Sequence, residues 1–211
     1  MSIESVRKDY SKHVLEENEC PQNPIEMLDG WLKNAVDHSV DANAMTVCSV
    51  AADGMPSSRI VLIRKLDERG LSFFTNYTSQ KGREFEAHNK VAVNFFWAWA
   101  ERQVRVQGII ERLPAEESDA YFDSRPRESQ LGAWASDQSE KMASRTELEE
   151  KLAEVERRFD GKPVPRPEHW GGFLIKPVHF EFWQGRPSRL HDRIVYQQDQ
   201  HGAWVISRLN P

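Results

Sequence analysis

The sequence predicts a mainly β protein, built as a closed or half-closed antiparallel barrel with helices packed outside it. Three observations support this fold class. Short β-rich runs follow one another across residues 44–112 and again from residue 171. The turns between them are short, and the helical segments are inserted between groups of strands instead of alternating with single strands. A parallel sheet of βαβ units is therefore not expected.

A helix is predicted over residues 23–38. Asn23 suits the N-cap, Pro24 suits the first helical position, and Glu26 follows three residues after the cap. Apolar residues then recur at the spacing of one helical face, namely Ile25, Leu28, Leu32 and Ala35. This face is expected to pack against the barrel.

Strands are expected on both sides of a second, shorter helix. Three runs separated by tight turns form a meander: AMTVCSVAA, PSSRIVLIRKLD and LSFFTN. Two more form a β pair around Ala100-Glu101: KVAVNFFWAW and RQVRVQGIIERL. Between the two groups, TSQKGREFEAHN has the pattern of a helix with Thr78 or Ser79 at its N-cap. With the runs near the C-terminus, roughly six or seven strands are expected.

Helices return in an insertion over about residues 114–160. Residues 144–159 carry a capping box of Ser144 and Glu147, followed by an apolar stripe of Leu148, Leu152, Val155 and Phe159. A proline-rich loop then leads to three more strand-like runs, GGFLIKPVHFEFWQG, RIVYQQD and AWVISRLNP. The chain is expected to comprise an N-terminal segment, residues 1–22, and a barrel domain, residues 23–211, which includes the helical insertion.

The composition is that of a soluble globular protein, with 211 residues, 39% hydrophobic and 29% charged. The longest apolar run, VNFFWAWA, is far shorter than the ~20 residues of a membrane-spanning helix. No export signal is visible, so a cytoplasmic protein without a membrane partner is expected. Cys20 and Cys48 form neither a disulfide framework nor a metal or redox pair, and no metal site is expected. A formal net charge of −5 argues against a nucleic-acid partner.

Common catalytic motifs are missing from the sequence, namely GxGxxG after a strand, GxxxxGK[ST], GxSxG and HExxH. Clusters of cations are present instead. The densest is FWQGRPSRLHDR at 182–193, with three arginines beside Trp183. It has two interpretations: a solvated loop whose arginines pair with Asp192 and other nearby acids, or a site for a small anion.

Two other runs suit an anionic ligand. SRIVLIRK places arginines in an otherwise apolar strand, where a cation is costly without an anionic partner. NYTSQKGRE supplies hydroxyls and a lysine at a helix start, where free backbone N–H groups and the helix dipole favour phosphate. The alternative for this run is an ordinary N-cap with a surface lysine. Two phosphate-suited groups on one small barrel indicate two phosphorylated molecules held near each other.

The chain resembles the pyridoxamine 5′-phosphate oxidase family over nearly its whole length. The resemblance lies in the order and spacing of RIVLI, FFTN, SQKG, RQVRVQG, YFDSRPRESQLGAW, SDQS, WGGF and EFWQGRPSRLHDR. It implies a split β-barrel homodimer that binds FMN at the subunit interface. It also implies oxidation of pyridoxamine or pyridoxine 5′-phosphate to pyridoxal 5′-phosphate in vitamin B6 biosynthesis or salvage, with hydride passing from substrate C4′ to flavin N5 and O2 reduced to H2O2.

The resemblance also implies which residues form the site. The cofactor residues would be Arg59, Arg64, Phe74, Thr75, Lys81, Gln103, Gln138, Ser139, Trp183 and Arg193. The substrate residues would be Arg64, Tyr121, Arg125, Ser129, Arg189 and His191, with Arg7 and Tyr10 in a segment able to cover the substrate. Arg189 and His191 are the candidate catalytic residues because they would lie over the pyridine ring. Whether either of them acts as a base stays open at this point.

Some points have alternatives. The family's usual lysine after the RIVLL-type strand aligns with Arg64, whereas strict strand alternation puts Lys65 on the face of Arg59. Arg64 is the preferred contact because the count from Arg59 to Asp67 matches the family without a gap. Gln80 replaces a usual arginine, so one phosphate cation is lost.

The alternative function is a flavin or vitamin-phosphate binding protein without turnover. A third possibility for the function is another flavin chemistry, such as nicotinamide-dependent reduction.

Overall fold

The structure, a computed structural model, describes residue 2 and residues 9–211. Its centre is a nine-stranded sheet in which every paired strand runs antiparallel to its neighbour. The strands are β1 (Ala44–Val50), β2 (Pro56–Leu62), β3 (Lys65–Asp67), β4 (Gly70–Asn76), β5 (Lys90–Trp97), β6 (Arg102–Arg112), β7 (Trp170–Gln184), β8 (Asp192–Gln198) and β9 (Trp204–Arg208). Their order is β2-β1-β5-β6-β7-β4-β3, with β8 on β7 and β9 on β8. The predicted antiparallel half-barrel is confirmed.

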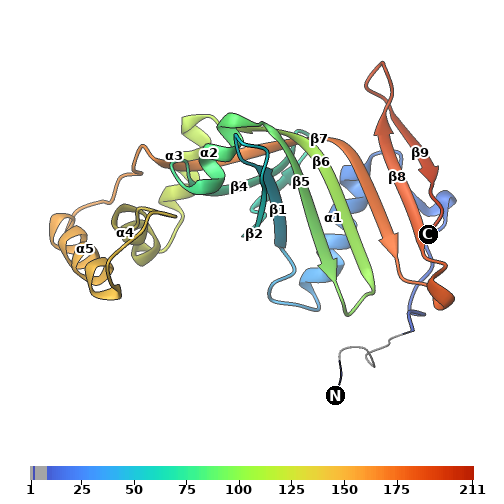
Figure 1. Ribbon diagram of the computed structural model, residues 1–211, viewed down its shortest axis with the longest axis horizontal. Helices are drawn as coiled ribbons and strands as arrows, with labels where there is room; N and C mark the ends of the chain where they lie inside the picture. Colours follow the sequence, from blue (N-terminus) through green and yellow to red (C-terminus); the bar gives the residue numbers. More distant parts are fainter. Residues whose placement is uncertain (1, 3–8) are drawn as a thin grey trace.

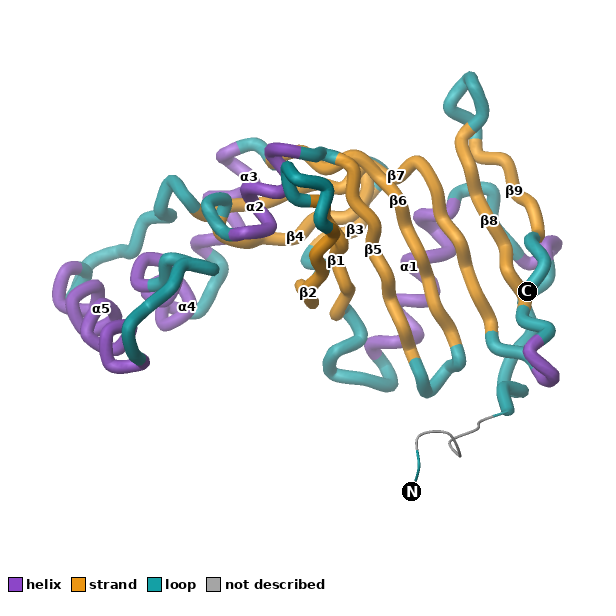
Figure 2. The backbone as a smooth tube through the Cα atoms, in the orientation of Figure 1, coloured by secondary structure: helices purple, strands orange, loops and turns teal. Residues whose placement is uncertain are grey.

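The longest strand, β7, connects the two parts of the sheet. One of its edges pairs with β6 along most of its length. The other edge is shared, because β4 pairs with residues 170–175 and β8 pairs with residues 179–184. Figures 1 and 2 show the result, an elongated molecule with β8 and β9 at one end and helices at the other.

The helix α1 (Pro24–Val36) covers one face of the sheet (Figure 2). Its N-cap is Asn23, whose side chain accepts a hydrogen bond from the Ile25 backbone N–H, as the sequence predicts. The buried face of α1 joins the main core with the inner residues of the strands, among them Val47, Val104, Phe182 and Tyr196.

The remaining helices gather at the other end of the molecule. They are α2 (Gln80–Ala87), α3 (Ala115–Asp123), α4 (Arg127–Ala135) and α5 (Arg145–Arg158), with short 3-10 turns η2 (Glu17–Glu19) and η3 (Pro187–Arg189) elsewhere. Ser79 is the N-cap of α2 and Ser144 that of α5. Helices α3 to α5 have a small core of their own with the start of β7, formed by Phe122, Leu131, Phe159, Val164 and Trp170. None of the helices in the described part of the chain is long and apolar enough to cross a membrane.

The strand count exceeds the expected six or seven, partly because the run PSSRIVLIRKLD is not one strand. It ends as β2 at Leu62 and resumes as β3 at Lys65. At the break, the Ile63 N–H donates to the Asn43 carbonyl and the Arg64 N–H donates to the Ser72 carbonyl. The chain therefore changes partner from β1 to β4 at this point. Strict alternation of side chains does not hold across such a break.

Candidate functional site

The main candidate site is a cavity of about 660 Å³ between β2, β4 and the helices α2 to α4. It brings together nine of the predicted site residues, namely Arg59, Arg64, Phe74, Thr75, Lys81, Tyr121, Arg125, Ser129 and Gln138. These residues come from segments up to 79 positions apart in the chain (138 − 59). The fold thus assembles in one place residues that the resemblance assigns to the cofactor and residues that it assigns to the substrate.

Lys81 forms the first group, at the start of α2. Its side chain is buried, and its Nζ lies 3.2 Å from Thr75 Oγ1, 3.4 Å from Ser79 Oγ and 3.1 Å from Gln138 Oε1. Burial, and next the charge of Arg59, lower the pKa of Lys81 to about 8. No acidic side chain of residues 9–211 forms an ion pair with this ammonium group. A buried ammonium with only neutral partners is suited to an incoming anion.

Gly82 explains why the helix can begin so close to this strand end. A Cβ on Gly82 would lie 1.9 Å from the Tyr77 carbonyl oxygen, which no other residue type could tolerate without moving the backbone. Ser79 caps the same turn, because its hydroxyl accepts a hydrogen bond from the Gly82 N–H at 3.3 Å. The motif SQKG therefore sets the position of the Lys81 side chain relative to β4.

Arg59 has an anionic partner inside the chain. Its Nη2 lies 3.0 Å from Glu84 Oε2, and the same carboxylate oxygen accepts from the hydroxyls of Ser49 and Ser57. Glu84 is buried and comes from α2. The inference that an arginine in this apolar strand needs an anion is thus met by Glu84, and Arg59 by itself does not indicate a ligand.

Arg125 forms the second group, at the junction of α3 and α4. Its guanidinium carbon lies 4.5 Å from the centre of the Trp170 ring. Its Nη1 atom is buried and has no hydrogen-bond partner in the described structure. Burial lowers the pKa of Arg125, and the charge of Arg64 acts in the same direction. A buried N–H donor without an acceptor is costly, so this geometry also favours an anionic ligand.

An aromatic stack adjoins Arg125 in the cavity. The rings of Phe74 and Tyr121 lie 3.8 Å apart and nearly parallel, and Trp170 continues the stack 5.7 Å from Phe74. This stack keeps Tyr121 at the cavity wall, where its neighbour Ser129 also lies. Two hydroxyls therefore lie in the same cavity as the arginine, where they can donate hydrogen bonds to an anion.

The Arg64 and Lys65 alternatives are separated by the structure. Arg64 lines the cavity and forms no ion pair with a described residue, whereas Lys65 does not line it and its Nζ lies 3.0 Å from Asp67 Oδ2. Strict alternation would put Arg64 on the face opposite Arg59. Because the chain breaks between β2 and β3, alternation does not hold there, and Arg64 lines the same cavity as Arg59. The count of residues from Arg59 was thus the better guide to the cavity.

Five other predicted residues lie elsewhere, at the far end of β7. Gln103, Trp183 and Arg193 face each other in register on β6, β7 and β8, while Arg189 and His191 lie in or just after η3. The strand β7 has 15 residues and a contour of roughly 45 Å at ~3.3 Å per residue, so this group does not reach the cavity of its own chain. Ser139 follows Gln138 and lines a separate, smaller pocket of about 180 Å³, which Gln138 also lines.

The arginines of FWQGRPSRLHDR are largely paired. Arg186 lies 3.1 Å from Asp192, and Arg193 donates to both oxygens of the buried Glu181. Among the described residues, no ion pair involves Arg189. The expected pairing with nearby acids is therefore found for two of the three arginines, although Arg193 lies in β8 and not in a loop.

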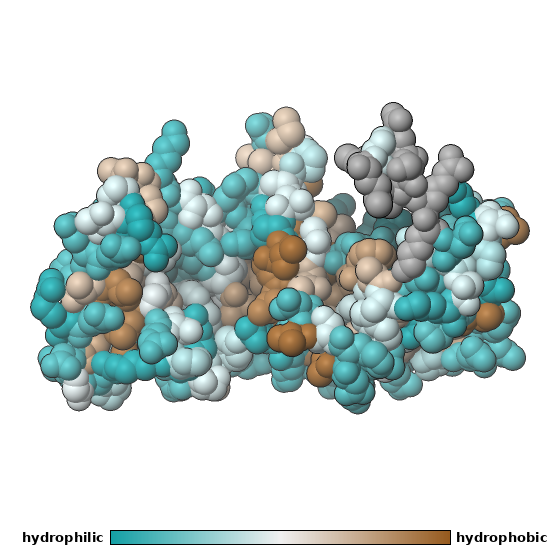
Figure 3. All heavy atoms as spheres, turned by 90° about the horizontal axis from the view of Figure 1, so that it is seen from below, coloured by the Kyte–Doolittle hydropathy of each residue, from teal (hydrophilic) through white to brown (hydrophobic). Residues whose placement is uncertain are grey.

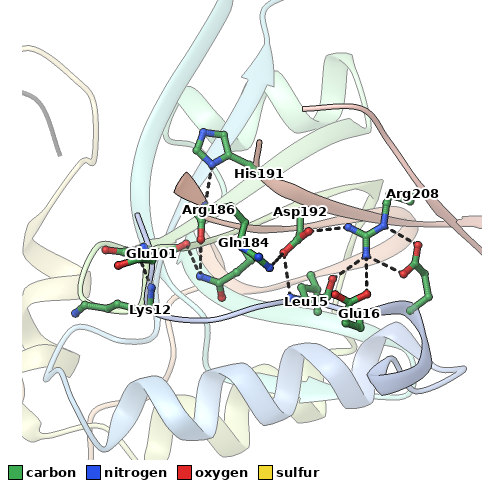
Figure 4. A network of polar contacts seen from close by, with 12 residues as sticks. Lys12, Leu15, Glu16, Glu101, Gln184, Arg186, His191, Asp192 and Arg208 are labelled. Carbon is green, nitrogen blue, oxygen red and sulfur yellow. Dashed lines mark hydrogen bonds and ion pairs between the residues drawn. The ribbon is translucent and has the colours of Figure 1, made fainter. Parts of the chain in front are cut away.

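The N-terminal segment passes beside the residues at the far end of β7. Tyr10 packs edge-on against Trp183 at 5.7 Å and against His191 at 5.9 Å, whereas Arg7 lies outside the described residues. Two buried carboxylates hold the segment by its backbone. Glu101 accepts from the N–H groups of Ser11 and Lys12, and Asp192 accepts from that of Leu15 (Figure 4). We call residues 9–15 the N-terminal strap.

Sequence reasoning missed Glu101 and Gln184 as part of this region. Gln184 is fully buried and its amide donates to the carbonyls of Ala100 and Glu101, while its oxygen accepts from Arg102 Nε. Glu101 adopts a left-handed backbone with φ 56°, which is uncommon outside glycine. In the sequence Glu101 lies in an expected turn and Gln184 at the end of an expected strand. No sequence pattern there indicates that either residue is buried or hydrogen-bonded.

Comparison with known proteins decides the family. A family model described as pyridoxamine 5′-phosphate oxidase matches residues 33–159, and one described as the pyridoxine 5′-phosphate oxidase C-terminal dimerisation region matches residues 170–211. The chain belongs to the pyridoxamine 5′-phosphate oxidase family. The predicted family, and with it an enzyme of that family, is confirmed.

Close relatives cover the full chain. A protein of Thermosynechococcus vestitus called pyridoxine/pyridoxamine 5′-phosphate oxidase is 52% identical over 99% of both chains. One of Pseudomonas paraeruginosa with the same name is 50% identical over 100% of this chain and 99% of its own. Among solved structures, PhzG from Burkholderia lata 383, in complex with tetrahydrophenazine-1-carboxylic acid, is 30% identical with a TM-score of 0.88, over 95% of this chain and 100% of that one. The split-barrel fold of the family is thereby confirmed.

Lys81 gives a prediction on stability. We expect Lys81→Met to raise the free energy of unfolding of the ligand-free protein at pH 7 by about 1–3 kcal/mol, because the buried ammonium has no anionic partner. Between pH 8 and pH 10 the unfolded chain keeps the lysine proton that the folded chain has lost, so the wild type gains stability and the difference shrinks. Thermal unfolding at pH 7 and pH 9.5, at equal protein concentration, measures both effects.

The control for this experiment is Lys65→Met, since Lys65 is exposed and paired with Asp67. We expect this variant to change stability by less than about 0.5 kcal/mol at either pH. A Lys81→Met protein less stable than the wild type at pH 7 would contradict the unpaired state of the ammonium.

Proposed function

We propose that the chain is an FMN-dependent oxidase that converts pyridoxamine 5′-phosphate and pyridoxine 5′-phosphate to pyridoxal 5′-phosphate, with O2 reduced to H2O2. The observation that carries this proposal is the pair of phosphate-suited positions in one cavity, Lys81 at one and Arg125 at the other. A protein that binds only a flavin needs one phosphate position. A second position indicates a second phosphorylated ligand, held next to the first.

The residues around Lys81 fit the phosphate of FMN. Lys81 would bind it directly, with the hydroxyl of Thr75 and the amide of Gln138 beside it. Arg59 would share its guanidinium between Glu84 and the ligand. When bound, the flavin supplies the redox chemistry, taking a hydride from substrate C4′ and passing the electrons to O2.

The residues around Arg125 fit the phosphate of the substrate. The unpartnered Nη1 would find its acceptor there, and the hydroxyls of Tyr121 and Ser129 would add two neutral donors. Arg64 lies in the same cavity and its charge reaches Arg125. In this proposal Arg64 contacts both ligands. The break between β2 and β3 is important for this role because it places Arg64 at the cavity.

We further propose that the working unit is a homodimer in which each cavity is completed by Gln103, Trp183, Arg189, His191 and Arg193 of a second copy. These residues lie too far along β7 to serve their own cavity. Phe96 stands in register with Gln103, and Ile60 lies on the same face through Thr46 and Asn94. Ile60 is 71% and Phe96 54% exposed. Hydrophobic side chains also gather near the middle of the face in Figure 3, amid a hydrophilic surface.

The assembly prediction is a mass in solution of twice 24.4 kDa with flavin bound. Light scattering coupled to size exclusion measures it at several protein concentrations. A mass of one chain in fully active protein would contradict the shared site.

The test of the activity is spectroscopic. We expect the purified protein to carry noncovalent FMN, and the flavin absorbance to bleach when pyridoxamine 5′-phosphate is added without oxygen. Admission of O2 should restore the colour and release H2O2. If neither pyridoxamine 5′-phosphate nor pyridoxine 5′-phosphate bleaches the bound flavin, the binding-protein alternative is favoured. A protein that takes up no FMN would refute FMN as its cofactor.

The matched variant for this test is Arg125→Met. We expect it to keep its FMN but to raise KM roughly 10- to 150-fold, because the lost charge-assisted hydrogen bonds are worth about 1.5–3 kcal/mol. An unchanged KM would remove the substrate phosphate from this position.

Arg64 and Lys65 give a paired prediction. We expect Arg64→Ala to weaken FMN or substrate binding tenfold or more, about 1.4 kcal/mol, because Arg64 lines the cavity. Lys65→Ala should change either affinity by no more than about twofold, since Lys65 pairs with Asp67 at the surface. FMN titration of both apo-variants, followed by steady-state kinetics, measures the difference. A larger defect in Lys65→Ala would overturn the assignment.

A further inference from the structure

The imidazole of His191 has one ring nitrogen already engaged within its own chain. The backbone N–H of Arg186 donates to His191 Nδ1 at 3.0 Å (Figure 4). A nitrogen that accepts a hydrogen bond presents a lone pair and carries no proton. Neutral His191 must therefore have its proton on Nε2, and that nitrogen can act only as a donor.

The loop between β7 and β8 holds this arrangement in place. Ser188 and Arg189 both have left-handed backbones, with φ 56° and 62°, and this tight turn returns His191 to the start of the loop. The Leu190 N–H closes the turn on the Pro187 carbonyl at 3.1 Å. Two consecutive non-glycine residues in this conformation are strained, so the surrounding contacts must fix the loop.

Both flanks of the turn are anchored to the sheet. On one side the Gly185 N–H donates to the Glu101 carbonyl at 2.8 Å. On the other side the Arg186 side chain lies 3.1 Å from Asp192, which itself opens β8. The Arg186 N–H consequently has little freedom to leave His191 Nδ1.

The charges around His191 also favour its neutral form. Burial lowers the pKa of His191, the positive charge of Arg189 lowers it further, and Asp192 opposes them in part. The other close groups are the rings of Trp183, at 4.6 Å, and of Tyr10 on the N-terminal strap, at 5.9 Å. A proton on Nδ1 would have to displace the Arg186 N–H and add a charge beside Arg189.

We propose that His191 serves the reaction as a neutral hydrogen-bond donor through Nε2–H, fixed in that tautomer by the Arg186 backbone, and not as a general base. This inference rests on the proposed function. Oxidation removes a hydride from substrate C4′, which the flavin accepts, and a proton from the attached nitrogen or oxygen. In this arrangement the proton goes to water, while Nε2–H binds an electron-rich atom of the substrate and orients its ring.

The tautomer can be measured without turnover. In ligand-free protein labelled with 15N-histidine, long-range 1H–15N spectra distinguish the two neutral tautomers, and His191→Gln identifies the signals of His191. We expect the proton on Nε2. Arg186→Ala is the matched control, because it removes the side chain and its ion pair but keeps the backbone N–H, and we expect the same tautomer in it. A proton on Nδ1 in the wild type would overturn the proposal.

Kinetics give the second readout. Glutamine can present an amide N–H where His191 has Nε2–H, so we expect His191→Gln to keep kcat within about tenfold and to keep the acidic limb of its pH profile. His191→Ala, without a donor, should lose more than the glutamine variant. A base would behave differently: both variants would lose roughly 10²- to 10⁴-fold and the acidic limb would disappear. Wild-type protein without oxidase turnover would refute the proposed function, while the NMR measurement would still decide the tautomer.

Discussion

The length of one strand governs the organisation of this protein. Strand β7 pairs with β6 along one edge and divides its other edge between β4 and β8. Its first residues line the cavity through Trp170, and its last residues carry Trp183. Because the strand is extended, the two ends cannot fold back on each other. The residues that the family resemblance assigns to one site are therefore placed by a single chain in two groups.

The two groups differ in how their cations are satisfied. At the far end of β7, Arg193 and Arg105 share the buried Glu181, and Arg186 and Arg208 share Asp192. In the cavity, Arg64, Lys81 and Arg125 form no ion pair with any residue of the described chain. Paired cations fix the structure of a loop or a sheet edge. Lys81 and Arg125 are also partly desolvated, and an unpaired, desolvated cation reduces the stability of the folded protein until an anion binds. The cavity therefore has cations suited to a ligand.

Much of this architecture could be predicted from local sequence signals. Asn23, Ser79 and Ser144 cap the helices that their positions indicate, since capping depends on a few consecutive residues. Long motifs also drew attention to Lys81 and Arg125, which the structure places in one cavity. Other features depend on contacts that a sequence does not show: the change of partner that splits β2 from β3, the ion pair of Arg59 with Glu84, and the buried hydrogen bonds of Gln184. In each case residues far apart in the chain decide the outcome.

The division of the site along β7 has a genetic consequence. In a dimer built as proposed, each cavity takes Arg125 from one subunit and His191 from the other. A subunit defective at Arg125 and a subunit defective at His191 would therefore complement each other when they assemble together. One of the two cavities in such a mixed dimer would contain both wild-type residues, and the other would contain both defects. Two inactive alleles could then restore partial activity, whereas two alleles altered at the same end of β7 could not.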